Sequence, residues 1–226
     1  MNAFSRSTIL ALLGLALAFQ SLSAQEPKTR AAKWERDIQA FEASDRIHPP
    51  PKGGILFIGS SSIRLWKTLA QDFPDQKVIN RGFGGSEIVD SVQFAERIVF
   101  PYEPKRIVFF AGGNDINAGK SPEQVFEDFK CFVGKVQGRL PEVRIAYISI
   151  TPAPVRWAQV EKIKALNALV EQYARERPKL TFIDAFPFIL NAEGQPREEL
   201  FVKDRLHLNE KGYALWTSLV RPWLTN

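Results

Sequence analysis

A chain of 226 residues, 45% of them hydrophobic and 12% aromatic, can bury one well-packed domain and is short for two. Its formal net charge of +5 is spread along the sequence without a basic stripe among aromatic residues, which argues against nucleic acid as a partner. The single cysteine, Cys131, excludes an intrachain disulfide, and two histidines without a cysteine cluster argue against a structural zinc site. We expect Cys131 to be a packed thiol on the apolar face of a helix.

Residues 1–24 have the pattern of a secretory signal peptide. Arg6 supplies a positive start, residues 9–19 form an apolar run, and small residues at 21–24 end the segment. We predict cleavage after Ala24, and hence a secreted or periplasmic protein without stable membrane insertion. The alternative, an uncleaved anchor, needs a longer apolar run than the about a dozen residues available.

Residues 25–52 are predicted to form an N-terminal helix and a proline-rich connector, ahead of a main domain at 53–226. Four apolar residues recur at helical spacing between charged ones: Ala31, Trp34, Ile38 and Phe41. The connector contains three consecutive prolines, which stiffen the chain before the first strand. His48 lies in this connector, and we expect it at the surface.

The rest of the chain alternates between short apolar runs and amphipathic segments. The apolar runs predict strands at 55–58, 77–80, 106–111, 143–150 and 180–183. The amphipathic segments predict helices at 63–73, 88–98, 156–176 and 208–219, and one more that begins at 121. This alternation is typical of a single doubly wound α/β/α three-layer domain, with a parallel sheet of about five strands and right-handed crossovers.

Three serines follow the first predicted strand, at the turn into a helix. Gly59 ends the apolar run, and Ser60, Ser61 and Ser62 precede the next helical pattern. Ligands bind at the carboxyl edge of an open parallel sheet, where the N–H groups of a helix start are also free. Three interpretations are open: a serine that only caps the helix, a loop that cradles phosphate, or a serine nucleophile. A nucleophile requires a base and an oxyanion hole from elsewhere in the chain.

Groups suited to that chemistry occur in other loops at the same edge. They lie at 84–85, at 113–114 and at 204–207. An imidazole can transfer protons at neutral pH, a carboxylate can hold its tautomer, and fixed N–H donors can stabilise an oxyanion. His207 is the one histidine outside the connector, so a histidine base has a single candidate. Asp204 has an alternative role, which is to pair with Arg205 or to cap the last helix.

The four loops resemble the blocks of the SGNH (GDSL) hydrolase family, in order and over the length from Gly54 to about Trp216. The matches are Gly59-Ser60-Ser61, Gly85 ahead of Ser86, Gly112-Gly113-Asn114-Asp115, and Asp204-x-x-His207. The sequence departs from the family at Ser60, where the first block has aspartate. The resemblance implies the flavodoxin-like fold of that family. It is strongest to secreted bacterial members and to the branch like platelet-activating-factor acetylhydrolase.

The resemblance also implies a role for each matched residue. Ser61 would be the nucleophile, His207 the general base and Asp204 the acid of a catalytic triad. The backbone N–H groups of Ser61 and Gly85 and the side-chain amide of Asn114 would form the oxyanion hole. This chemistry involves no cofactor and no metal.

The expected function is therefore a serine esterase that hydrolyses a small acyl ester, acetyl above all, on a carbohydrate. The alternatives are a lysophospholipid or platelet-activating-factor-like esterase, and a non-catalytic carbohydrate or nucleotide binder on the same fold. Asp115 is expected to bond loop backbone, and Trp157 to line the site.

Overall fold

The computed structural model describes residues 30–225. The signal peptide predicted at 1–24 lies outside the described residues. Its cleavage, the exported location and the domain boundaries remain predictions.

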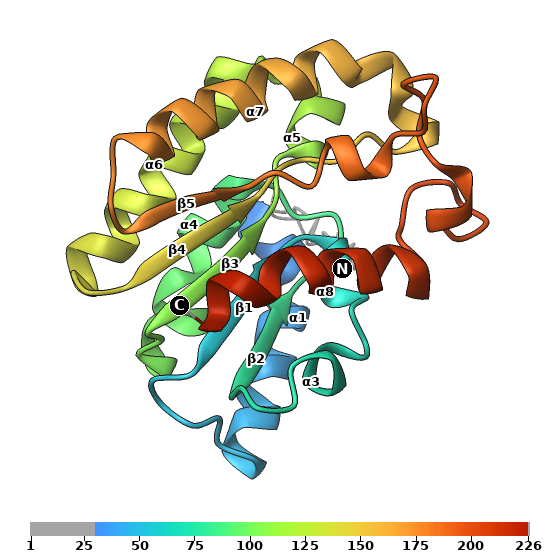
Figure 1. Ribbon diagram of the computed structural model, residues 1–226. Coiled ribbons are helices and arrows are strands. Elements are labelled where there is room, and N and C mark those ends of the chain that lie inside the picture. The colour runs from blue at the N-terminus through green and yellow to red at the C-terminus, as the bar shows by residue number, and fades with distance from the viewer. Residues whose placement is uncertain (1–29, 226) are drawn as a thin grey trace, which may run out of the picture.

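A five-stranded, all-parallel sheet forms the centre of the molecule, as the alternation of apolar runs predicted (Figure 1). Its strands are β1 (Ile55–Gly59), β2 (Val78–Gly82), β3 (Arg106–Phe110), β4 (Arg144–Ile148) and β5 (Leu180–Ile183). The strand order is β2-β1-β3-β4-β5, and it reverses direction between β1 and β3. Ligand sites of open α/β sheets lie outside the carboxyl ends of the strands at such a reversal.

The register brings the carboxyl ends of three strands to one level. Gly59 at the end of β1 pairs with Gly82 of β2 on one side and with Phe110 of β3 on the other. The loops that follow β1, β2 and β3 therefore start side by side, and these are the loops that carry the serines, the glycine pair and Asn114.

Helices cover both faces of the sheet, which gives the predicted three layers. The longer ones are α1 (Arg30–Ile47), α4 (Ile88–Ile98), α6 (Pro122–Arg139), α7 (Val160–Arg175) and α8 (Glu210–Thr225). Figure 1 shows α8 in front of the sheet and α1 and α4 behind it. The contacts run from α1 to α4, from α4 to α6 and from α6 to α7, so these four helices form one layer. None of the helices in 30–225 is long and apolar enough to cross a membrane.

Aromatic side chains fill the core on both faces. On the α8 side, Phe57 of β1 packs edge-on against Trp66 with ring centroids 5.6 Å apart. On the opposite side, Phe109 of β3 packs against Phe132 of α6 at 4.3 Å. Phe57 and Phe109 are out of step by one position in the register, so they point to opposite faces of the sheet. The sheet is therefore buried on both sides, as near-continuous apolar strands require.

The segment predicted as a helix at 63–73 is two short helices, so that prediction was wrong in detail. The helices are α2 (Ser61–Arg64) and α3 (Leu69–Asp72), separated by a turn. The turn allows Trp66 to be almost fully buried, and its indole N–H donates to Asp72 at 2.6 Å. Burial of the Trp66 ring in the core is therefore favoured over the single continuous helix that the spacing of the smaller apolar residues predicted.

Cys131 is exposed, so the prediction of a packed thiol was wrong. The buried side chains of α6 near it are Phe129, Phe132, Val133 and Val136, at intervals of three, one and three residues. This spacing defines the face that meets the sheet, and position 131 falls outside it.

The N-terminal helix α1 is attached firmly to the domain. Trp34 and Ile38 are buried, as their spacing predicted, and His48 after the helix is exposed, also as predicted. Arg97 of α4 donates to Glu35 at 2.7 Å and to Glu42 at 2.6 Å. Near the other end of α1, Arg30 donates to the buried Asp90 at 2.7 Å. The helix therefore belongs to the same folding unit as the sheet.

Candidate active site

The turn after β1 is possible only because residue 59 is glycine. Gly59 has φ of +142°, and a Cβ built there would lie 2.0 Å from the carbonyl oxygen of Phe110. Both the positive φ and the short distance to Phe110 exclude a residue with a side chain at this position. The chain leaves the strand at this point, Ser60 turns inward and is buried, and Ser61 begins α2.

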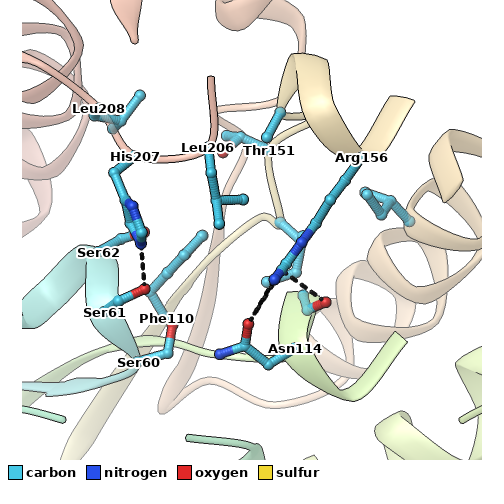
Figure 2. Close-up of a pocket in the computed structure, with 14 residues that line it drawn as sticks. Ser60, Ser61, Ser62, Phe110, Asn114, Thr151, Arg156, Leu206, His207 and Leu208 are labelled. Carbon is cyan, nitrogen blue, oxygen red and sulfur yellow. Dashed lines mark hydrogen bonds between the residues drawn. The ribbon is translucent and has the colours of Figure 1, made fainter. Parts of the chain in front are cut away.

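Helix capping does not explain these serines. Ser60 occupies the N-cap position of α2, but its side chain makes no capping hydrogen bond. Ser61 Oγ lies 2.8 Å from Nε2 of His207 (Figure 2). A serine hydroxyl that faces an imidazole has the geometry of a nucleophile with its base.

His207 also contacts Asp204 through its other ring nitrogen. Nδ1 of His207 lies 2.6 Å from Oδ2 of Asp204, and the second carboxylate oxygen accepts the backbone N–H groups of Leu206 and His207, each at 2.9 Å. Partial burial opposes ionisation of Asp204, but the hydrogen bonds from His207 and Leu206 outweigh it and lower the pKa of this carboxyl. An ionised Asp204 can only accept, so Nδ1 carries the proton and Nε2 is free to accept from Ser61.

The alternative partner of Asp204, Arg205, is used elsewhere. The Arg205 guanidinium donates to Glu198 at 2.5 Å. Arg205 also has φ of +57°, a left-handed conformation at the centre of the turn that brings His207 back toward Asp204. The residue therefore contributes through its backbone and leaves the carboxylate of Asp204 to the histidine.

Asn114 lies across the pocket from Ser61, near the start of the short helix α5 (Gly113–Asn117). Its Oδ1 accepts from Nη1 and Nη2 of Arg156, both at 3.1 Å, and its Nδ2 donates to the Ser86 carbonyl at 2.9 Å. Exchanging oxygen and nitrogen would break all three hydrogen bonds, so the orientation of the amide is determined. Figure 2 shows the amide nitrogen on the side of Ser60 and Ser61, and within residues 30–225 one of its two N–H groups has no acceptor.

Gly85 lies one loop away from the pocket. It precedes Ser86, whose hydroxyl donates to the Gly59 carbonyl at 3.3 Å, and it has φ of +78°. Gly85 is not among the residues that line the pocket around Ser61. The backbone N–H groups of Gly85 and Ser61 both lack an acceptor among the described residues. The structure thus brings Ser61, His207, Asp204 and Asn114 together and leaves Gly85 beside them.

The pocket itself is small and mixed in character. It has a volume of about 40 Å³. Its polar lining includes Ser61, His207 and Asn114, and its apolar lining includes Ile150 and Leu206. A pocket of this size can hold a short chemical group between the Ser61 hydroxyl and the Asn114 amide.

The prediction that Trp157 lines the site was wrong, and one pocket residue was missed. Trp157 does not line the pocket, whereas its neighbour Arg156 does. Both belong to the 3-10 helix η2 (Pro154–Gln159), and its geometry turns the arginine inward. The sequence signal that could have indicated Arg156 is a basic residue in the segment that follows a strand end. A single such residue resembles many surface arginines, so no motif singled it out.

Asp115 bonds the loop backbone, as predicted. Its fully buried carboxylate accepts the backbone N–H of Ile88 at 3.2 Å and the ammonium of Lys120 at 3.3 Å. Burial raises its pKa to about 6, against the opposing effect of Lys120. Since Ile88 begins α4, this contact ties the loop of Asn114 to the loop of Gly85.

A serine, a histidine and an aspartate in hydrogen-bonded series, with an amide donor opposite, form the arrangement that serine hydrolases use for acyl transfer. Residues 59–215 match the model of the GDSL-like Lipase/Acylhydrolase family. The protein belongs to this family and is a carboxylic ester hydrolase.

Similar proteins come from animals, bacteria and fungi. The chain is 29% identical to platelet-activating factor acetylhydrolase IB subunit alpha1 of Pongo abelii over 195 residues, which covers 80% of this chain and 78% of the relative. A GDSL-like lipase from Bacteroides thetaiotaomicron has the same fold, with a TM-score of 0.73 at 20% identity over 84% of this chain and 97% of that chain. A carbohydrate esterase of family 3 from Talaromyces cellulolyticus aligns with a TM-score of 0.61 at 17% identity, over 76% and 95% of the two chains.

Proposed function

We propose that this protein is a serine esterase that removes a small acyl group, acetyl above all, from a carbohydrate. Ser61 is the nucleophile, His207 the general base and Asp204 the group that orients it. The observation that carries the proposal is the 2.8 Å contact between Ser61 Oγ and His207 Nε2, continued at 2.6 Å to Asp204. A hydroxyl is a weak nucleophile until a base accepts its proton, and this contact supplies the base.

The reaction proceeds in two halves. Ser61 Oγ attacks the carbonyl carbon of the ester while His207 Nε2 takes the hydroxyl proton, and the imidazolium is stabilised by Asp204. His207 then gives this proton to the alcohol oxygen as the carbon–oxygen bond breaks, which leaves an acyl group on Ser61. A water molecule attacks the acyl-enzyme with the same histidine as base, and the acid and the free serine are released.

Three N–H groups are assigned to the oxyanion formed in each half. They are the backbone N–H groups of Ser61 and Gly85 and the free N–H of the Asn114 amide. Support comes from their lack of acceptors among the described residues. A donor without a partner can turn its full hydrogen bond to the developing negative charge, and each such donor contributes about 3–4 kcal/mol in related chemistry.

The size of the pocket supports a short acyl group. With a volume of about 40 Å³, bounded by Ile150 and Leu206, it has room for a few heavy atoms. A long alkyl chain would not fit and would have to extend out of the pocket. A wider and more open groove of about 570 Å³ shares Leu208 with the pocket and includes Asn209, Lys211 and Tyr213 in its lining. Polar side chains beside an aromatic ring suit a sugar as the alcohol part.

The names of similar proteins are consistent with two substrate classes. The carbohydrate esterase from Talaromyces cellulolyticus shares the fold, and the relative from Pongo abelii is named as a subunit of a platelet-activating factor acetylhydrolase. A secreted or periplasmic location, which we propose from residues 1–24, also suits an extracellular glycan. A lipid esterase with a short acyl specificity is the second candidate, and it is favoured by the 29% identity to the platelet-activating factor acetylhydrolase subunit.

The test is hydrolysis of p-nitrophenyl esters from acetate to decanoate by the protein, with Ser61→Ala and His207→Ala alongside. Acetate should be cleaved best, and both variants should lose activity. Acetylated sugars would then be compared with short-chain phospholipid esters to separate the two substrate classes. If the unmodified protein shows no turnover above the variants on any ester, the proposed function is wrong.

A further inference from the structure

Arg156 brings a positive charge into the catalytic pocket without an acidic partner. The side chain is partly buried and lines the same pocket as Ser61 and Asn114. Within residues 30–225, no carboxylate lies at ion-pair distance from its guanidinium. Three other arginines of the domain differ in this respect, since each contacts a carboxylate: Arg30, Arg81 and Arg97.

The hydrogen bonds of Arg156 use only part of its guanidinium. Nη1 donates to the Gly113 carbonyl and to Asn114 Oδ1, and Nη2 donates to the same Oδ1, all at 3.1 Å. A guanidinium has five N–H donors, so two have no acceptor in the part of the chain that the structure describes. These are the Nε–H and the outer N–H of Nη2, which lie along one edge of the plane. That edge has the spacing that binds two oxygens of a carboxylate or a phosphate.

Burial makes this free edge energetically important. Loss of hydration lowers the pKa of Arg156, and no acidic neighbour acts in the opposite direction. An anion that enters the pocket would therefore meet a cation that is already partly dehydrated. Charged pairs gain more in such a place than at an exposed surface, where screening by water leaves little.

We propose that Arg156 is an anion subsite, which gives the enzyme a preference for acyl esters whose alcohol part carries a carboxylate or a phosphate. Figure 2 shows Arg156 on the opposite side of the pocket from Ser61 and His207, with Leu206 between them. An anion held at Arg156 would leave the ester carbonyl between the serine and the amide of Asn114. The proposal rests on the esterase function proposed above. A carboxylate would come from a sugar acid, and a phosphate from a glycerophosphate of the lipid type.

The first test compares two substrates that differ in one charge. These are an acetylated methyl galacturonoside with its free carboxylate, and the same compound with that carboxylate methylated. The unmodified protein should favour the charged form by about tenfold or more in kcat/KM, the effect of one charge-assisted hydrogen bond. The preference should fall when salt is added.

The variants isolate the contribution of Arg156. In Arg156→Gln the ratio of the two kcat/KM values should approach one, and in Arg156→Lys a part should remain, because the charge stays but the fork is lost. Arg175→Gln is the matched control, since Arg175 is exposed on α7 and pairs with Glu171. Arg156 also holds Asn114, so its variants will be slower on both substrates, and the ratio is therefore the quantity to compare. A preference for the charged substrate that Arg156→Gln leaves unchanged would overturn the proposal.

A second pair of substrates identifies the source of the anion. It consists of an acetyl ester of glycerophosphate and the matching uncharged glycerol acetate. Preference for the charged member of this pair alone would assign the subsite to phosphate, and preference within the sugar pair alone would assign it to carboxylate. A ratio near one in both pairs contradicts the subsite.

Failure of the subsite and failure of the esterase are distinguishable. Turnover of p-nitrophenyl acetate above that of Ser61→Ala establishes the esterase, whatever the charge ratios are. Binding of methyl galacturonoside to Ser61→Ala, measured by calorimetry against its methyl ester, tests the subsite without turnover. Tighter binding of the charged form that disappears when Arg156→Gln is added supports the subsite, and equal binding of both forms, in this pair and in the glycerophosphate pair alike, rejects it.

Discussion

The guanidinium of Arg156 donates two hydrogen bonds, both of 3.1 Å, to the single side-chain oxygen of Asn114. A fork of two donors on one acceptor prevents the amide from rotating, because either nitrogen of Arg156 would otherwise face an N–H group. The amide nitrogen of Asn114 is thereby kept on the side of Ser61 before any substrate arrives. Donors fixed in advance stabilise an oxyanion more than donors that must reorient.

Asn114→Ala should lower kcat by about 10²–10³-fold with little change in KM, because in the proposed mechanism its N–H group acts on the charge that develops in the transition state. The matched control is Asn117→Ala, which removes an exposed amide from the end of the same helix. Steady-state kinetics with p-nitrophenyl acetate measure both. A fall of similar size in the two variants would assign the effect to α5 as a whole.

Asp204→Asn should lower kcat by about 10⁴-fold, because an amide at this position supports the wrong tautomer of His207. The hydrogen bonds to Asp204 lower its pKa from the ordinary 3.8, so its carboxylate should remain ionised through the mildly acidic range. Asp184→Asn, which changes an exposed aspartate outside the site, should match the unmodified protein at every pH. Near-normal activity of Asp204→Asn would remove Asp204 from the mechanism.

Gly59→Ala should reduce the free energy of unfolding by roughly 3 kcal/mol or more, since the Cβ meets the Phe110 carbonyl and φ is positive. Gly134→Ala serves as its control. Gly134 lies inside α6 with no atom within 4 Å of the Cβ position, so this change should stabilise the protein by about 0.5–1 kcal/mol. Urea denaturation compares the two. Equal stability of the two variants would show that the turn after β1 can adjust.

Asp115 should make the stability depend on pH. Burial raises the pKa of its carboxyl from 3.8 to about 6, so between these values the folded chain binds more protons than the unfolded chain. The unfolding free energy should therefore fall, by about 3 kcal/mol from this group, as the pH rises from about 4 to about 6. Asp115→Asn removes this contribution. Urea denaturation at several pH values should show the unmodified protein losing stability relative to the variant over that range, and parallel curves would contradict the assignment.

Leu206→Ala should shift the acyl preference toward longer chains. The Leu206 side chain extends into the pocket between His207 and Arg156, and its truncation enlarges a space of only about 40 Å³ (Figure 2). The ratio of butyrate to acetate turnover should rise about tenfold, the effect of roughly two methylene groups in an apolar site. Phe188→Ala, which truncates an exposed side chain outside the pocket, should leave the ratio unchanged. An unchanged ratio in Leu206→Ala would show that another residue limits the acyl group.

The sheet could be predicted from the sequence because its strands are short, apolar and bounded by glycine, proline or charge. The break between α2 and α3 could not. The apolar residues from 63 to 73 fit one helix, and only the cavity that receives the Trp66 ring decides for a turn. The prediction that the Cys131 thiol is packed was wrong for a related reason. Which face of α6 meets the sheet depends on the position of α4 and α7.

At the site, the motifs predicted residues whose spacing along the chain is informative. Ser61 and Asn114 each follow a strand, and His207 follows Asp204 by three residues. Arg156 has no such signature, because its position in the pocket depends on how η2 turns back over α5. The pocket volume is likewise a product of side chains from five separate stretches of the chain. Contacts of this kind become visible only once the chain is folded.

Ser61 and His207 are 146 positions apart, and the hydrogen bond between them is made by the last loop before the C-terminal helix. A nascent chain whose final segment has not yet left the ribosome has no histidine beside the Ser61 hydroxyl, and this hydroxyl is therefore unreactive. The same holds for any form in which α8 has detached. Ester cleavage is therefore a reporter of complete folding. Its loss during thermal or chemical denaturation would register undocking of the C-terminal segment before the central sheet separates.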